Sequence, residues 1–420
     1  MDTPRKLIVG YDLCDDFTQI SCYSYKSMEP IPISLREGEE ERPIPTVLCL
    51  KTETKQWIFG EDAIVCANNG GGLLVDHLLD KLQKEESVNL FGIEYLPITL
   101  LEKYLRKTLM LVKNYFPTET ITKLVVTVRN ADPILVGKIY EALEALGLEK
   151  DRAVVMNHAG AYLYYALSQD KALWMNDVGL FDFSEEGLYF YQLSINRRSK
   201  PMIAQIAKKE YTDSLSISMV KSKMNNLSYI FENTAAAALY KQLITTLYFT
   251  GNGFDGGWAD EAMKSLCVGR RAFMGQNLFT KGACYAAKEL SGDRNLEEFL
   301  LLNDDMITSF VTLRVYSDTT FKELPLIEAG ENWYEVDKSI EIIPEGRGEL
   351  EITIKNIVTR DVKRDTVQVL QFPERPDKMT RLLVHISCKD RLTVLIRIKD
   401  LGFGDFYMGS EQEMDYTLDL

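Results

Sequence analysis

The hydrophobic pattern of the chain changes its period near Asn303. Beyond that point apolar and polar side chains alternate, as in Leu350, Ile352, Ile354 and in Leu392, Val394, Ile396, Ile398. A period of two gives each strand one buried and one solvated face, which is typical of an antiparallel β-sandwich. Before that point short apolar strands are interleaved with segments of helical period, which is typical of an α/β domain. We therefore predict an α/β domain over residues 1–303, a β-sandwich over 304–410 and an acidic, frayed tail over 411–420.

The charge balance limits the partners that the sequence predicts. Lys and Arg number 48 and Asp and Glu 62, which gives a net charge of −14. Because phosphate groups are bound by clustered basic side chains, we expect neither nucleic acid nor an anionic membrane as a partner. No apolar run reaches the ~18 residues that span a bilayer, and the charged N-terminus does not resemble a signal peptide. The sequence therefore predicts a cytoplasmic protein.

The seven cysteines and three histidines are scattered along the chain. None of the cysteines forms a CxxC pair, and an odd number of them cannot all pair in disulfides. The sequence therefore predicts neither a zinc site nor a disulfide framework.

The α/β part shows an ordered series of elements. Strands are predicted at 6–11, 17–25, 124–128, 153–156, 178–183, 188–195, 202–206 and 247–250, and helices at 133–146, 159–167, 234–244, 258–267 and 279–290. Two of the hairpins follow a strand that ends near an aspartate, first Asp12 and then Asp182. A glycine-rich turn, Gly251-Asn252-Gly253-Phe254, precedes the last two helices.

This order resembles the ATPase superfamily of actin, sugar kinases and heat-shock chaperones, most closely those of the DnaK type. Asp12-Leu13 and Asp182-Phe183 stand where the family has its two phosphate motifs, and Gly60-Glu61-Asp62-Ala63 reads like its "GEDA" turn. The stretch from Phe372 through Gly402 resembles part of the chaperones' substrate-binding sandwich. The overall look also suggests an uncharacterised bacterial family of such proteins. The resemblance implies a two-lobed, actin-like ATPase (ribonuclease H-like) domain with reduced subdomains, followed by an all-β sandwich.

The resemblance also implies a nucleotide site. Asp12 and Asp182 correspond to the two residues beside the magnesium ion and the attacking water, so they are the residual catalytic and metal-binding candidates. Gly251, Asn252, Gly253 and Phe254 correspond to the turn around the adenosine of ATP or ADP. Binding of ATP with magnesium is expected to be weak or absent.

The residues around these positions depart from the family. The chaperones' catalytic lysine falls on Ile64, and the glutamate of their "NEPTAA" motif falls on His158, which we expect to be packed or solvated and not a general base. Four carboxylates replace small or hydroxyl residues of the phosphate loops: Asp15, Asp16, Glu185 and Glu186. No cationic residue is expected near these loops. Two like charges ~4 Å apart repel by about 4 kcal/mol at an effective dielectric of 20, so a polyphosphate is disfavoured.

These observations favour a chaperone-related protein that binds a partner or an extended peptide segment and has a degenerate ATP site. Hydrolysis of ATP is expected to be absent or marginal. One alternative is an ATP-dependent DnaK-like chaperone with an unconventional, metal-assisted phosphate site. Another is an actin-like scaffold that assembles with itself.

Overall fold

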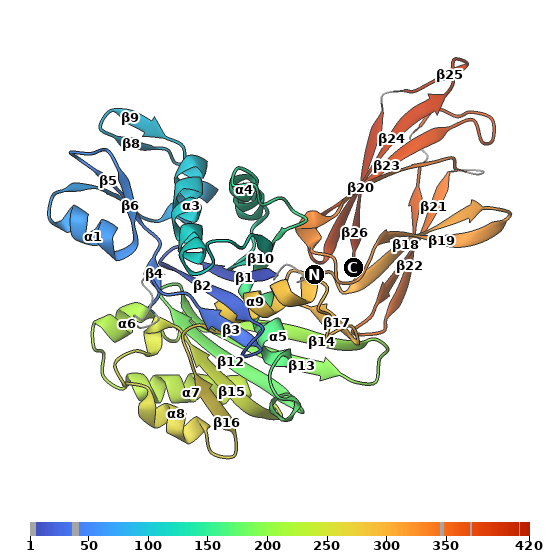
Figure 1. The fold of residues 1–420 in the computed structure, drawn as a ribbon. Helices are drawn as coiled ribbons and strands as arrows, with labels where there is room; N and C mark the ends of the chain where they lie inside the picture. Colours follow the sequence, from blue (N-terminus) through green and yellow to red (C-terminus); the bar gives the residue numbers. More distant parts are fainter. Residues whose placement is uncertain (1–5, 36–41, 345–347, 370–371, 411) are drawn as a thin grey trace, which may run out of the picture. The chain divides into compact units, whose positions relative to one another are not determined.

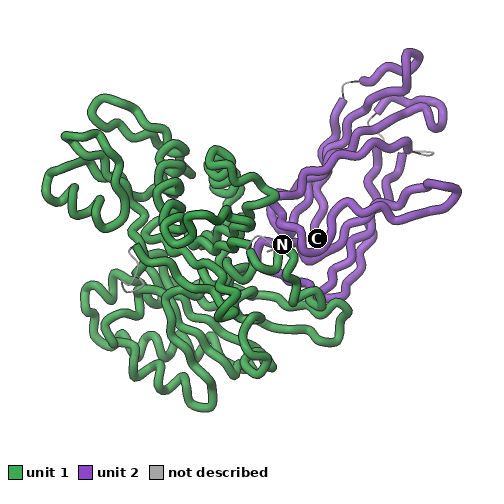
Figure 2. The backbone as a smooth tube through the Cα atoms, in the orientation of Figure 1, with its two compact units in different colours: residues 1–299 green, residues 300–420 purple. Residues whose placement is uncertain are grey.

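The computed structural model describes residues 6–35, 42–344, 348–369, 372–410 and 412–420. The chain forms two compact units, residues 1–299 and 300–420 (Figure 2). The division falls within strand β17 (Phe299–Leu302), whereas the sequence pattern placed it at 303/304. Among the helices that the structure describes, none is long and apolar enough to cross a membrane.

The first sheet of unit 1 has the strand order β11-β10-β1-β2-β3, and β4 also pairs with β2 (Figure 1). Its strands are β1 (Leu7–Leu13), β2 (Phe17–Ser24), β3 (Glu29–Pro32), β4 (Ile44–Pro45), β10 (Ile121–Val128) and β11 (Ala153–Asn157). Strands β1, β2 and β3 are antiparallel, while β10 runs parallel to both β1 and β11. The fully buried β1 therefore lies in the middle of a mixed sheet.

Five strands of the second sheet repeat this topology in the order β16-β15-β12-β13-β14, and β17 is the sixth strand of that sheet. The five are β12 (Asp177–Ser184), β13 (Gly187–Asn196), β14 (Met202–Glu210), β15 (Ile244–Thr250) and β16 (Arg271–Met274). As in the first sheet, the hairpin strands are antiparallel and the two later strands run parallel. Strands β1 and β12 are thus equivalent, and Asp12 and Asp182 each pair with a threonine of the parallel neighbour, Thr127 and Thr250.

Helices α5 (His158–Leu167) and α9 (Leu278–Leu290) pack closely together and against the first sheet. Gly282 of α9 faces the carbonyl of Ala161 in α5 so closely that any side chain would overlap it. Gly10 of β1 faces the backbone of Cys284 in α9 in the same way. Glycine at these two places therefore fixes how near the helices come to each other and to β1.

The remaining helices of unit 1 are α1 (Gly60–Asn68), α2 (Leu78–Gln83), α3 (Pro97–Tyr115), α4 (Pro133–Glu144), α6 (Ile217–Lys221), α7 (Leu227–Leu239) and α8 (Asp260–Leu266). Strands β5 (Leu48–Lys51), β6 (Trp57–Phe59) and β7 (Gly72–Val75) form a small sheet, and β8 (Val88–Leu90) pairs with β9 (Ile93–Tyr95). Helix α3 was not predicted from the sequence. The helix predicted over 234–244 is wrong at its end, because α7 ends at Leu239 and Ile244 begins β15.

Unit 2 consists of two antiparallel sheets that share one hydrophobic core, the arrangement of a β-sandwich. One sheet has the order β19-β18-β21-β22; in the other, β20-β23-β24-β25, strand β26 also pairs with β24. The strands are β18 (Ser309–Ser317), β19 (Thr320–Ile327), β20 (Asp337–Ile342), β21 (Glu349–Asn356), β22 (Val362–Gln368), β23 (Arg381–Asp390), β24 (Thr393–Phe403), β25 (Tyr407–Met408) and β26 (Glu413–Asp419).

The acidic C-terminal segment is part of this sandwich, so the expectation of a frayed tail is wrong for residues 413–419. Strand β26 pairs with β24 over residues Thr393 to Lys399. Met414 and Leu418 are buried in the shared core, while the acidic residues alternate with them on the exposed face. The acidic residues that suggested a frayed tail lie on the exposed face of strand β26. Residue 411 lies outside the described residues.

A buried ion pair links two segments of unit 2. Arg375 donates to both carboxylate oxygens of Asp400 at 2.7 Å, and the Asp400 carboxylate also accepts from the backbone of Gly402 and Ser410 at 2.9 Å. The hydrogen bonds from Arg375 hold the pKa of Asp400 well below its usual range. This pair fixes the segment around Arg375 to the hairpin of β24 and β25.

Candidate functional site

The two candidate aspartates both approach one histidine at the centre of unit 1. His158 Nε2–H donates to Asp12 Oδ1 at 2.8 Å, and His158 Nδ1 lies 4.0 Å from Asp182 Oδ2. All three side chains are buried, with exposed fractions of 1% for Asp12 and His158 and 3% for Asp182. The structure therefore brings together the two aspartates singled out from the sequence, with His158 between them.

Local structure fixes the position of His158. It is the first residue of α5, directly after β11, and the preceding Asn157 caps the helix by accepting from Gly160 N at 2.8 Å. Its imidazole stacks on the ring of Phe279 in α9, with 3.7 Å between the ring centroids. His158 is therefore packed between elements and not solvated.

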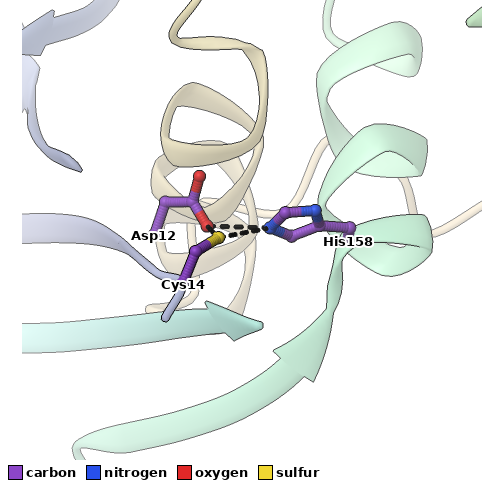
Figure 3. Close-up of side chains that lie close together, drawn as sticks. All are labelled: Asp12, Cys14 and His158. Carbon is purple, nitrogen blue, oxygen red and sulfur yellow. Dashed lines mark hydrogen bonds and ion pairs between the residues drawn. The ribbon is translucent and has the colours of Figure 1, made fainter. Parts of the chain in front are cut away.

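Cys14 lies close to both Asp12 and His158, and these three side chains form a buried cluster (Figure 3). Its Sγ lies 3.5 Å from Asp12 Oδ1 and 3.7 Å from His158 Nε2. Burial, together with the charge of Asp12, raises the pKa of the Cys14 thiol well above its usual range. A buried thiol of this kind is a poor nucleophile, so the Cys14–His158 contact does not form a thiol-based catalytic pair.

Asp182 differs from Asp12 in its hydrogen bonding. Burial raises the pKa of Asp182 to about 6, against the opposing influence of Arg129 and His158. Within the described part of the chain, neither Asp182 Oδ2 nor His158 Nδ1 has a hydrogen-bond partner, although both atoms are buried. Two polar atoms thus face each other across 4.0 Å without a bond between them.

Arg129, directly after β10, connects the two loops that follow β1 and β12. One of its terminal nitrogens lies 3.1 Å from Asp16 Oδ2, and the other lies 3.0 Å from Glu186 Oε1. The Arg129 side chain is only 7% exposed. Although burial lowers it, the pKa of Arg129 is raised overall by the surrounding acidic groups. The expectation that no cationic residue lies near these loops is therefore wrong.

The other two loop carboxylates also have partners within unit 1. Asp15 accepts from the backbone of Leu79 at 2.9 Å and lies 2.8 Å from His77 Nδ1. Glu185 is 2.7 Å from Lys221 Nζ. The loop carboxylates are therefore engaged with neighbouring basic or backbone groups, which the sequence analysis did not foresee.

A cavity of about 600 Å³ lies over the first loop. Its lining includes Cys14, Arg129 and the loop carboxylates, and its acidic members are Asp15, Asp16, Asp80, Glu185 and Glu186. Five carboxylates surround one arginine and one histidine, so the lining carries an acidic excess. The residues Gly251 to Phe254 do not belong to this lining.

The glycine-rich turn after β15 packs against the chain itself. Gly251 has φ +99°, and a Cβ there would overlap the carbonyl of Phe183. A Cβ at Gly253 would lie 2.6 Å from the ring of Phe183. The rings of Phe183, Phe254 and Trp258 pack together beside the turn. The small residues predicted to accept adenosine therefore make room for Phe183.

Unit 1 is a mixed α/β unit whose two large sheets repeat one topology over five strands, and it contains a buried Asp–Cys–His cluster. Residues 29–304 match the model of a family described as "Family of unknown function (DUF5716) C-terminal", and residues 306–420 match "Domain of unknown function (DUF8552)". Because the first match covers more than half of the chain, the protein belongs to the DUF5716 family. No curated protein matches the sequence.

Proposed function

We propose that the protein binds a protein partner or an extended peptide segment and does not turn over ATP, although unit 1 has the frame of an actin- and DnaK-like ATPase. The observation that carries this proposal is the position of Arg129, which forms ion pairs with Asp16 and Glu186 between the two loops. In the superfamily that the sequence resembles, the nucleotide phosphates lie between these loops.

The repeated sheet topology supports the proposed frame. Five strands of each sheet follow the same order, and each central strand has an aspartate near its end. The nucleotide-binding domains of the superfamily have two such halves, so the repeat agrees with the resemblance found in the sequence. The frame remains a proposal based on topology and on motif order.

The loops do not fit a bound polyphosphate. Arg129 is already ion-paired with two carboxylates, so a phosphate beside it would bring its negative charge next to theirs. Two such charges at 4 Å repel by about 4 kcal/mol at an effective dielectric of 20. Two contacts of this kind would offset the ~8 kcal/mol of a micromolar affinity.

Magnesium does not fit the cluster around Asp12 either. The Oδ1 atom of Asp12 accepts from His158, and the nearest further donor atom is the sulfur of Cys14. Magnesium prefers an octahedron of oxygen ligands, several of them water. We therefore derive no catalytic step through ATP and magnesium.

Exposed apolar side chains in unit 2 support partner binding. Phe406 and Met408, at the hairpin of β24 and β25, are 95% and 79% exposed. Tyr316 and Phe321, at the hairpin of β18 and β19, are each 62% exposed and contact each other edge to face. Exposed apolar groups that cluster at hairpins are typical of contact surfaces for other polypeptides.

Calorimetry with ATP and magnesium tests the first half of the proposal. We expect no binding at micromolar nucleotide and no steady-state hydrolysis. A clear binding isotherm, together with hydrolysis that Asp12→Ala abolishes, would contradict the proposal. That result would favour the alternative of a metal-assisted ATPase, for which the convergence of Asp12 and Asp182 on His158 is the supporting observation.

Fluorescence anisotropy with labelled apolar peptides tests the second half. We expect affinities on the order of micromolar, changed less than about tenfold by ATP and magnesium, because a ligand shifts an equilibrium only by its differential affinity. The double variant Phe406→Ser, Met408→Ser should weaken binding, and the exposed pair Val362→Ser, Ile343→Ser on other segments serves as a control. Absence of any peptide binding would instead favour a self-assembling scaffold.

A further inference from the structure

We propose that Asp12, Cys14 and His158 form a buried binding site for a zinc-type transition-metal ion, in place of the magnesium site that the superfamily resemblance implies. This inference does not depend on the proposed function. It rests on the donor atoms of three side chains from β1, the residue after β1 and the start of α5 (Figure 3).

The distances between the donor atoms fit a tetrahedral ion. Sγ of Cys14 lies 3.5 Å from Asp12 Oδ1 and 3.7 Å from His158 Nε2, and the oxygen and nitrogen are 2.8 Å apart. With usual bond lengths to zinc, the edges of such a tetrahedron measure about 3.3–3.6 Å. Two edges are therefore near their final length. The third is a hydrogen bond that must open by about 0.5 Å when the ion replaces its proton.

The chemistry of the donors selects among metals. One thiolate, one imidazole and one carboxylate suit zinc and related borderline ions, whereas magnesium and calcium prefer oxygen donors. The thiolate and carboxylate together carry two negative charges, which balance a divalent cation. The loaded cluster would be close to neutral, as a buried position requires.

Protons balance in a simple way when the ion binds. The thiol of Cys14 releases its proton to solvent, and the proton on His158 moves from Nε2 to Nδ1. There it faces Oδ2 of Asp182, 4.0 Å away, a buried atom without a hydrogen-bond partner in the described residues. A carboxylate beside the outer nitrogen is the usual partner of a metal-bound histidine. The proton would then lie between two unpaired buried atoms, which must move closer than 4.0 Å to form a hydrogen bond.

One of the three proposed ligands borders a cavity, from which an ion can approach. Cys14 lines the cavity of about 600 Å³, together with Leu13, Asp15 and Asp16. The acidic excess of that cavity attracts cations. A site with three protein ligands and one position open to water is the usual arrangement of non-structural zinc.

Metal titration of the full chain tests the inference. We expect chelator-treated protein to bind one equivalent of zinc, and cobalt in its place to produce a thiolate-to-cobalt charge-transfer band. A large excess of magnesium should not compete. If the folded wild-type protein binds no zinc or cobalt, or if cobalt binds without the thiolate band, the proposal is overturned.

Variants locate the site. Cys14→Ser should abolish the charge-transfer band. It should also weaken zinc binding by at least about 100-fold, because loss of a residue that only supports a ligand already costs up to that much. Asp12→Asn should weaken zinc binding and leave the band in place.

The matched control is Cys22→Ser, which changes a buried cysteine on the adjacent strand β2 and should leave both readouts unaltered. Circular dichroism of the metal-free variants checks their folding. Equal zinc affinity in wild type and folded Cys14→Ser would overturn the assignment.

Discussion

The loops after β1 and β12 occupy equivalent places in two sheets of the same topology, yet they are stabilised in different ways. In the first, Cys14 reaches Asp12 and His158, and the residue two places beyond Thr127 is Arg129. In the second, the position equivalent to Cys14 is Ser184, whose buried hydroxyl has no partner among the described residues, and the position equivalent to Arg129 is Asn252. Identical topology thus supports a polar cluster in one half and aromatic packing in the other.

The largest change in stability is expected at the glycine-rich turn of the second sheet. Gly251→Ala should lower the free energy of unfolding by about 3 kcal/mol, because it combines a left-handed φ with overlap of the Phe183 carbonyl. Its equivalent in the first half is Val128, which has a side chain without such a conflict. Urea denaturation measures the difference.

The control for this variant is Gly137→Ala. Gly137 lies inside α4, and a Cβ there would meet no atom within 4 Å. We expect this change to stabilise the protein by about 0.5–1 kcal/mol through helix propensity. Equal effects of the two alanines would show that Phe183 does not constrain the turn.

The next largest change in stability is expected when Arg129, which belongs to the first sheet's loops and has no basic equivalent in the second, is removed. Arg129→Ala should destabilise the protein by about 2–3 kcal/mol, since it leaves Asp16 and Glu186 without their shared cation. The matched control is Lys221→Ala, which removes an exposed partner of Glu185 and should cost less than about 1 kcal/mol. Thermal melts of both variants give the comparison.

The buried Arg375–Asp400 pair of unit 2 can be compared with the Arg129 pairs of unit 1. Its contribution to stability is expected to depend on pH. The pKa of Asp400 is lowered by Arg375, so the pair contributes stability that is complete above the unfolded pKa of about 3.9 and is lost as pH falls toward the folded-state pKa. Hydrogen exchange in β23 and β24 at pH 7 and pH 3 should show this loss. Asp400→Asn should reduce the pH dependence, whereas Asp415→Asn at the exposed Arg397 pair should alter it little. An unchanged pH dependence in Asp400→Asn would contradict the role of the pair.

The smallest effect is expected at the position equivalent to Cys14. Ser184→Ala removes a buried hydroxyl that has no partner in the described structure, so it should be neutral or stabilise by up to about 1 kcal/mol. Its counterpart Cys14→Ala should destabilise, because the thiol contacts Asp12 and His158. A marked loss of stability in Ser184→Ala would mean that the two loops are more alike than their contacts indicate.

The sequence predicted the strands that carry Asp12 and Asp182 because alternation and turn residues are local signals. The role of Arg129 was not predicted, because both of its partners are distant in the sequence. Asp16 lies 113 positions away, and Glu186 lies in the loop between β12 and β13 of the other sheet. The Asp12–Cys14–His158 cluster was missed for the same reason, since His158 is 146 positions from Asp12. Only the two-residue spacing of Asp12 and Cys14 could have suggested it.

Other misses had local signals that the sequence analysis did not use. Helix α3 begins with Pro97 and buries Leu100, Leu101, Tyr104 and Leu105 at helical spacing. In β26 the alternation of Met414, Tyr416 and Leu418 was hidden by acidic neighbours. The end of α7 had no such signal, because neither glycine nor proline follows Leu239, although Lys241 has a left-handed φ of +58°.

The close approach of α9 to β1 has a consequence for how the protein folds. Thr280 donates to the Gly10 carbonyl across 270 positions, and Cys284 reaches Ile8 across 276. Strand β1 is therefore synthesised long before α9, the helix that covers one of its faces. High contact order of this kind slows folding and leaves apolar strands uncovered in the meantime. A nascent chain should thus remain sensitive to proteases and open to general chaperones until α9 has emerged from the ribosome.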